Sequence, residues 1–131
     1  TVVDACVGES VAAAMMARAA DLVSDEALAS VLAGIAEDEL RHAELGWRIV
    51  GWSLAGGNAE LVAVVEGAFV AAQAAAVDAV ETPAGFDDSV SNAGGRLTPT
   101  QRKQVIDKTW RDVIQPARTA MLARYQALRA A

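Results

Sequence analysis

The sequence predicts an all-α fold on the strength of three observations. Alanine is abundant and proline is limited to three residues, which favours helices packed closely on small side chains. No segment alternates apolar and polar residues as a half-buried strand does. Four stretches instead repeat apolar residues at helical spacing, and a length of 131 residues fits a single domain, residues 1–131. The expected helices cover residues 2–23, 26–54, 59–80 and 98–129.

Local signals mark the ends of the first two helices. A short polar turn follows the first helix, and there Ser24 or Asp25 can accept a hydrogen bond from the free N–H groups that begin the second helix. A Gly-Gly-Asn sequence at residues 56–58 ends the second helix, because glycine and asparagine readily leave the helical conformation. The first two helices are therefore expected to form an antiparallel hairpin.

The third and fourth helices are separated by a long polar loop, expected over residues 81–97. The third helix consists mostly of Ala and Val. Thr98 and Gln101 form a capping box at the start of the fourth helix, with a proline at its first helical position. Pro116 is expected to kink or break this helix, because proline has no N–H group to donate.

Composition excludes several classes of partner and linkage. The formal net charge is −6 and no cluster of Lys and Arg is present, so nucleic acid is not expected as a partner. Cys6 is the only cysteine, so no disulfide can form within the chain, and we expect it to be a small core residue rather than a ligand. No uninterrupted apolar run of about 18 residues occurs, so no membrane span is expected.

Charged residues interrupt the apolar stripes expected on the first two helices. The stripe of the second helix, at spacings of four and three, consists of Leu28, Leu32, Ile35, Glu39, His42, Gly46 and Ile49. The stripe of the first helix consists of Val2, Cys6, Glu9, Ala13, Met16, Ala20 and Val23. Glu9, Glu39 and His42 are therefore expected to point into the core.

The hairpin also brings these three residues to one level. Glu9 lies 15 residues before Ser24, and Glu39 lies 15 residues after it. At about 1.5 Å per residue, both lie roughly 22 Å from the turn. His42 is one helical turn beyond Glu39. Two antiparallel helices would thus place two carboxylates and an imidazole side by side.

Such a group of side chains is typical of a metal site. Two carboxylates buried without a cation would be costly and would repel each other. Carboxylate oxygens together with an imidazole nitrogen suit iron, manganese or zinc. The spacing Glu39-x-x-His42 places both groups on one helix face, and helical di-iron and di-manganese proteins use this motif. We therefore expect Glu9, Glu39 and His42 to be metal ligands.

The segment Asp38-Glu39-Leu40-Arg41-His42 resembles the D-E-x-R-H motif of the ferritin-like, carboxylate-bridged di-iron superfamily. Residues 6–52 and 110–122 resemble the second helix pair and the C-terminal part of a bacterial ferritin-like domain protein. The resemblance implies an antiparallel four-helix bundle with a dinuclear site, for which iron is the first choice of metal and manganese or zinc the alternatives. It also implies that Asp38 bonds a histidine ligand and that Arg41 pairs with such an aspartate.

A full site of this class needs four carboxylates and two histidines, so this chain supplies half. Glu66 and Gln73 fall on the stripe expected for the third helix, but Gln73 is an amide and Glu66 lies about two turns from the level of the site. They are the weaker candidates, and the fourth helix has no histidine. The missing half is expected from a second copy in a homodimer or oligomer, or from a partner chain with the complementary helix pair. The chain itself could equally be the C-terminal half of a larger domain.

Two functions remain open on the sequence. In the first, the chain supplies half of a dinuclear iron or manganese site with the oxidoreductase or iron-oxidising activity that the resemblance implies. No catalytic residue can be named, and whether the protein is an enzyme stays undecided. In the second, it is a non-catalytic helical subunit for assembly, with a degenerate site in which neighbouring side chains satisfy Glu39 and His42.

Overall fold

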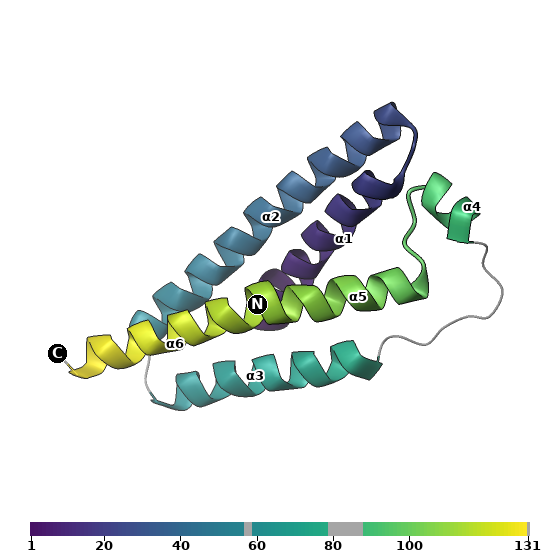
Figure 1. The fold of residues 1–131 in the computed structure, drawn as a ribbon. Helices are drawn as coiled ribbons and strands as arrows, with labels where there is room; N and C mark the ends of the chain where they lie inside the picture. The colour runs from purple at the N-terminus through teal and green to yellow at the C-terminus, as the bar shows by residue number, and fades with distance from the viewer. Residues whose placement is uncertain (57–58, 79–87, 131) are drawn as a thin grey trace.

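The computed structural model describes residues 1–56, 59–78 and 88–130, and every regular element in these ranges is helical. The elements are η1 (Val2–Gly8), α1 (Glu9–Leu22), α2 (Glu26–Ala55), α3 (Ala59–Asp78), α4 (Asp88–Ala93), α5 (Pro99–Thr109), η2 (Trp110–Ile114) and α6 (Gln115–Ala130). The η elements are π-helical turns, so η1–α1 and α5–η2–α6 are each one continuous helical segment (Figure 1). The all-α prediction is confirmed, with four long segments close to the expected bounds.

The predicted helix caps form as expected. The backbone N–H of Leu28 donates to Asp25 Oδ1 at 2.9 Å. The backbone N–H of Thr98 donates to Gln101 Oε1 at 2.9 Å, and the N–H of Gln101 donates to Thr98 Oγ1 at 3.3 Å. Helix starts are predictable here because each cap depends on residues within three positions of one another.

Two local expectations need correction. The segment expected to be a loop over residues 81–97 contains the short helix α4, although residues 79–87 lie outside the described ranges. Pro116 does not break the fourth helix, since α6 continues from η2 without interruption. Instead, the turn before it is widened, and the N–H of Gln115 donates to the carbonyl of Trp110, five residues back. A π turn accommodates the hydrogen bond that proline cannot make.

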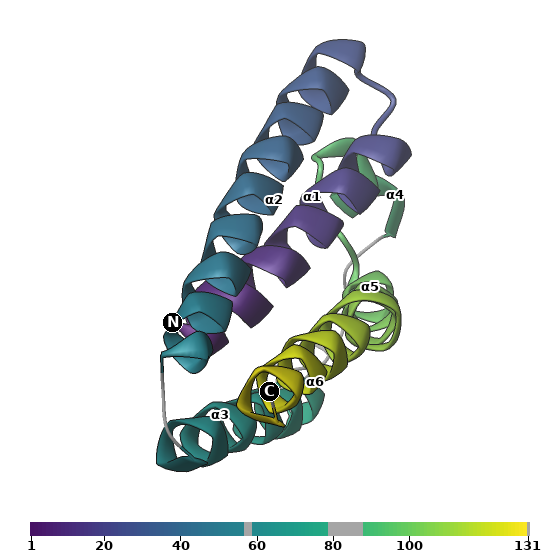
Figure 2. The ribbon, with the colours of Figure 1, turned by 90° about the vertical axis from the view of Figure 1, so that its left-hand side faces the viewer.

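The long segments form two layers, and each layer consists of two antiparallel segments. The hairpin of α1 and α2 is one layer, and α3 with the oppositely directed α5–α6 segment is the other (Figures 1 and 2). The layers meet around η1 and spread apart toward the α1–α2 turn, where α4 lies. The expected ferritin-like bundle, with four helices side by side, is not confirmed by this arrangement.

The main core joins both layers near η1. Its four most deeply buried large side chains each come from a different segment, namely Cys6, Leu54, Phe69 and Ile114. A smaller cluster of Ala19, Val23 and Leu32 fills the far end of the hairpin. Gly95 packs there with φ 71°, and a Cβ on it would lie 3.1 Å from Leu32 Cδ1, so both its conformation and its space favour glycine.

The hairpin closes most tightly at Gly46. A Cβ built on Gly46 would lie 2.6 Å from the Ala5 Cβ and 2.8 Å from the Ala5 carbonyl carbon. The missing side chain therefore lets α2 approach the backbone of η1 closely. Because Glu9 follows Ala5 by one turn, this approach also fixes the distance between Glu9 and α2.

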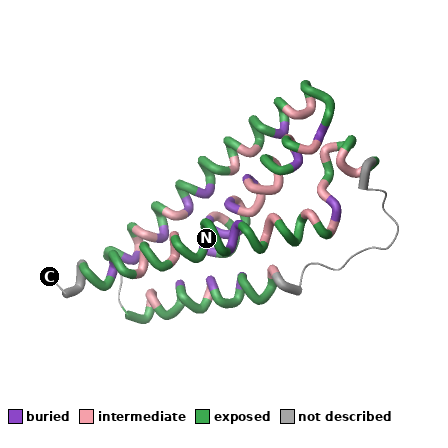
Figure 3. Tube along the Cα trace, viewed as in Figure 1, coloured by how far each residue is buried: buried purple, intermediate pink, exposed green. Residues whose placement is uncertain are grey.

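The inner face of α2 differs from the predicted stripe. Leu32 and Gly46 are buried as expected, but Ile35, His42 and Ile49 are exposed, so their predicted place in the core is wrong. The buried residues of α2 are Leu32, Ala43, Gly46, Val50 and Leu54. This line faces η1–α1, since Ala43 and Gly46 allow the close approach, and the exposed positions 35, 42 and 49 lie on another side of the helix. Figure 3 shows buried and exposed positions alternating along α2.

Helix α3 likewise presents a face shifted from the predicted one. Val65, Phe69 and Ala72 are buried, whereas Glu66 and Gln73 are exposed, so their expected inward position is wrong. By length and composition alone, Ala59–Ala76 could cross a membrane, with a mean hydropathy of 1.5 and 17% of the window buried. Core helices can pass the same test, and α3 contributes Phe69 to the core, so the expectation of no membrane span stays a prediction.

Candidate metal centre

Glu9, Glu39 and His42 form a compact group in which one ligand atom from each residue lies within 4.8 Å of the others. Glu9 is the first residue of α1, where the π-helical η1 passes into regular helix, and the other two lie in the middle of α2. The prediction that equal spacing on either side of Ser24 brings these side chains together is confirmed. Their role as ligands stays a prediction.

The group lies on an open flank of the hairpin rather than in a sealed core. Glu9 is half-buried, and the side chains of Glu39 and His42 are 28% and 63% exposed. The expectation that all three are buried is therefore wrong for the single chain. The physical reason is the rotation of α2, which places Glu39 at the border of the buried line and His42 beyond it.

Hydrogen bonds link the three side chains. His42 Nδ1 lies 3.2 Å from Glu39 Oε2. A hydrogen bond with Glu39 raises the pKa of Glu9, and burial and the charge of Glu39 act in the same direction. Hydrogen bonds from Glu9 and His42 lower the pKa of Glu39. The opposite shifts show that the two carboxylates interact directly, so a cation bound between them would relieve their mutual repulsion.

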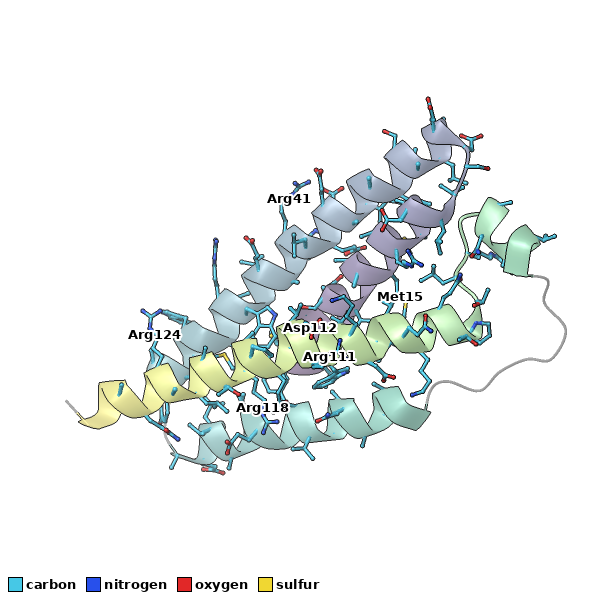
Figure 4. The ribbon with its side chains drawn as sticks, in the orientation of Figure 1. Met15, Arg41, Arg111, Asp112, Arg118 and Arg124 are labelled. Carbon is cyan, nitrogen blue, oxygen red and sulfur yellow. The ribbon has the colours of Figure 1, made fainter. Side chains whose placement is uncertain are left out.

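Asp38 and Arg41 form the pair that the motif implies. The Arg41 guanidinium donates to Asp38 and lies 4.0 Å from Glu37 Oε2, and it projects away from the other helices (Figure 4). Asp38 and Arg41 are both largely exposed. Among the described residues, Asp38 makes no hydrogen bond to His42, whose Nδ1 faces Glu39 instead. The implied bond from Asp38 to a histidine ligand is therefore not made within the chain.

Ser10 and Trp47, which the sequence did not single out for the site, brace the helices beneath it. Ser10 is buried and donates from Oγ to the carbonyl of Cys6 at 2.6 Å, while Trp47 Nε1 donates to Ser10 Oγ at 3.4 Å. The Trp47 ring stacks on Phe69 with centroids 5.4 Å apart. The Arg118 guanidinium lies 5.8 Å from the centre of the Phe69 ring, between α6 and α3 (Figure 4). In the sequence, the only indication of this role is that Ser10 is a polar residue next to Glu9 in an alanine-rich segment.

Cys6 is a core residue, as predicted. Its side chain is fully buried, and burial raises the pKa of the thiol to about 11. A neutral thiol is a poor metal ligand, since the thiolate is the coordinating form.

The other segments do not complete the site. Glu66 and Gln73 are exposed and lie outside the ligand group. Within the described residues, that group consists of Glu9, Glu39 and His42. On the fourth helical segment, Asp107 pairs with Lys103 at 3.3 Å, and Asp112 pairs with Lys108 at 2.6 Å. These two acids form ion pairs on their own helical segment and are not part of the ligand group on the hairpin.

The donor set fits one transition-metal ion. Two carboxylates and one imidazole are a ligand combination found in metal centres that keep open coordination positions. A second ion of a dinuclear site would need at least as many donors again, which the described residues do not supply.

No protein-family model matches this chain, and neither does any curated protein or solved structure. The resemblance to ferritin-like proteins therefore depends on the D-E-x-R-H motif and on residues 6–52 and 110–122 of the sequence alone.

Proposed function

We propose that this protein binds iron, or alternatively manganese or zinc, through Glu9, Glu39 and His42, and supplies half of a dinuclear carboxylate site in a ferritin-like helical assembly. A second copy or a partner chain supplies the other half. The observation that supports the proposal is the convergence of three ligand atoms within 4.8 Å from two separate helices. The fit to the ligand pattern of helical di-iron proteins supports it further.

Each residue has a distinct part in binding. Glu9 and Glu39 supply the negative charge, and a bound cation favours the ionised form of both carboxylates. Glu39 contacts the His42 ring and holds it beside the carboxylates. A bound iron ion would supply oxidation–reduction chemistry at its open positions.

Metal analysis of the purified protein tests the proposal. The chain is loaded separately with Fe²⁺ under anaerobic conditions, Mn²⁺ or Zn²⁺, freed of excess ion by gel filtration, and analysed by mass spectrometry for bound metal. We expect about one ion per chain. Glu39→Gln or His42→Ala should weaken binding by at least about tenfold, because even the loss of a residue that only hydrogen-bonds a ligand has an effect of this size. Glu60→Gln is the control, because Glu60 is an exposed acid on α3 rather than on the hairpin that holds the ligands. Unchanged binding in Glu39→Gln would contradict the proposal.

The alternative is a helical assembly subunit that carries no metal. One observation favours it, because the Glu39–His42 contact pairs two of the three side chains without an ion. In that case none of the three metals is retained, and Glu39→Gln leaves the oligomeric state unchanged.

A further inference from the structure

Helix α2 carries a second apolar line that faces solvent. We call it the α2 seam, and it consists of Val31, Ile35, Asp38, His42, Leu45, Ile49 and Trp52. Its five apolar members are 39–79% exposed. The alternating spacing of four and three residues is the pattern by which one helix packs along another. At about 100° per residue the centre of the seam lies roughly a quarter-turn or more from the centre of the line that faces α1, so it is a separate surface.

The seam is nearly symmetric about His42. Ile35 and Ile49 each lie seven residues from His42, and Val31 and Trp52 lie eleven and ten residues from it. If a second α2 packs antiparallel and is centred at His42, Ile35 therefore meets the partner's Ile49. Such self-complementarity is what a two-fold axis requires, because the same patch must fit itself. Any line with this spacing has such symmetry, and the pairing of Ile35 with Ile49 is what favours His42 as the centre.

Charges beside the seam fit the same register. Arg41, Arg48, Glu37 and Glu44 lie on the side of the seam away from α1, and all are exposed. Antiparallel packing about His42 brings Arg48 close to the partner's Glu37 and Arg41 close to the partner's Glu44. In the single chain Arg41 and Arg48 pair with Glu37 and Glu44 of their own helix, and in the dimer the same opposite charges can pair across the contact, which favours this alignment.

We propose that a second copy of this chain packs antiparallel on the α2 seam and contributes its own Glu9, Glu39 and His42 to the site. Glu39 and His42 lie within one turn of the two-fold centre, so the two ligand groups come to adjacent levels. Together they supply four carboxylates and two histidines. The metal part of this inference rests on the proposed function, whereas the seam and its register do not.

The mass of the protein in solution tests the seam. Light scattering coupled to gel filtration is measured for the wild type, Leu45→Glu and Val70→Glu over a range of micromolar concentrations. Leu45 and Val70 are each 57% exposed, but Val70 lies on α3, so it is a matched control. We expect a dimer for the wild type and Val70→Glu, and a folded monomer by circular dichroism for Leu45→Glu. A monomeric wild type, with and without Mn²⁺, or a dimeric Leu45→Glu, would overturn the proposal.

Disulfide formation tests the register. Ile35→Cys and Ile49→Cys proteins are oxidised separately and as a mixture, and Cys6 does not compete because it is fully buried. We expect cross-linked dimers only in the mixture. In the antiparallel dimer, like positions are about 21 Å apart, beyond the roughly 7 Å between Cα atoms that a disulfide spans. Efficient cross-linking of either variant alone would overturn the antiparallel register.

The two proposals fail in different ways. A monomer that still binds one metal ion per chain would overturn the second copy and keep the metal site. A dimer that is disrupted by Leu45→Glu but retains no metal would overturn the proposed function and keep the seam.

Discussion

Replacement of Gly46 by alanine tests whether the close contact between η1 and α2 holds the candidate site together. The new methyl group would lie 2.6 Å from the Ala5 Cβ, 2.8 Å from its carbonyl carbon and 2.9 Å from its carbonyl oxygen. Two of these are backbone atoms, so no change of rotamer can relieve the overlap. Either η1 or α2 must therefore move.

The magnitude follows from two opposing effects. Alanine is better than glycine inside a helix by about 1 kcal/mol. Overpacking in a tight contact costs about 1–3 kcal/mol, and the upper end applies here because backbone must shift. We expect Gly46→Ala to lower the free energy of unfolding by about 2 kcal/mol after the two are combined.

Gly34→Ala is the matched control, because Gly34 lies in the same helix and a Cβ there would meet nothing within 4 Å. It should raise the free energy of unfolding by about 1 kcal/mol, so the two variants should differ by about 3 kcal/mol. Urea unfolding followed by circular dichroism measures both values. If Gly46→Ala proves as stable as Gly34→Ala, the close approach between Ala5 and Gly46 does not exist in solution.

Three further outcomes are expected. Thr98→Ala removes the side-chain half of the capping box and should cost about 1 kcal/mol in urea unfolding, with an unchanged result counting against the cap. Trp47→Phe keeps an aromatic ring over Phe69 but removes the donor to Ser10, and should cost about 1 kcal/mol or more in urea unfolding. An unchanged free energy of unfolding would count against the bond to Ser10. Carboxylate and imidazole ligands must be deprotonated to bind a metal ion, and the pKa of Glu9 is raised, so Mn²⁺ affinity should fall on acidification. Calorimetric titration across pH checks this, and an affinity that does not fall on acidification would contradict a carboxylate–imidazole ligand set.

The sequence was most informative where structure depends on near neighbours. The helix starts at Asp25 and Thr98 follow from capping residues within three positions. The meeting of Glu9 with Glu39 follows from a tight turn and a constant rise per residue. Neither needs knowledge of the tertiary packing.

The assignment of faces was less successful because α2 has two apolar sides. The predicted stripe took Leu32 and Gly46 from the buried line but Ile35 and Ile49 from the exposed seam. Spacings of four and three fit both lines, so periodicity alone cannot show which line packs against another helix of the same chain. The tight contact at Gly46 decides it, and that contact depends on η1, whose π-helical geometry the sequence pattern did not indicate.

The two apolar sides of α2 also explain why the site lies where it does. One side is covered by η1–α1 and the other is the seam, and the ligands straddle the border, with Glu39 next to the buried line and His42 on the seam. A helix on the seam would cover the imidazole and carboxylates and reduce their contact with water, which strengthens their attraction to a cation. If that helix belongs to a second copy, metal binding and dimerisation are linked. By thermodynamic reciprocity, Mn²⁺ must then strengthen the dimer by the same factor by which the dimer strengthens Mn²⁺ binding.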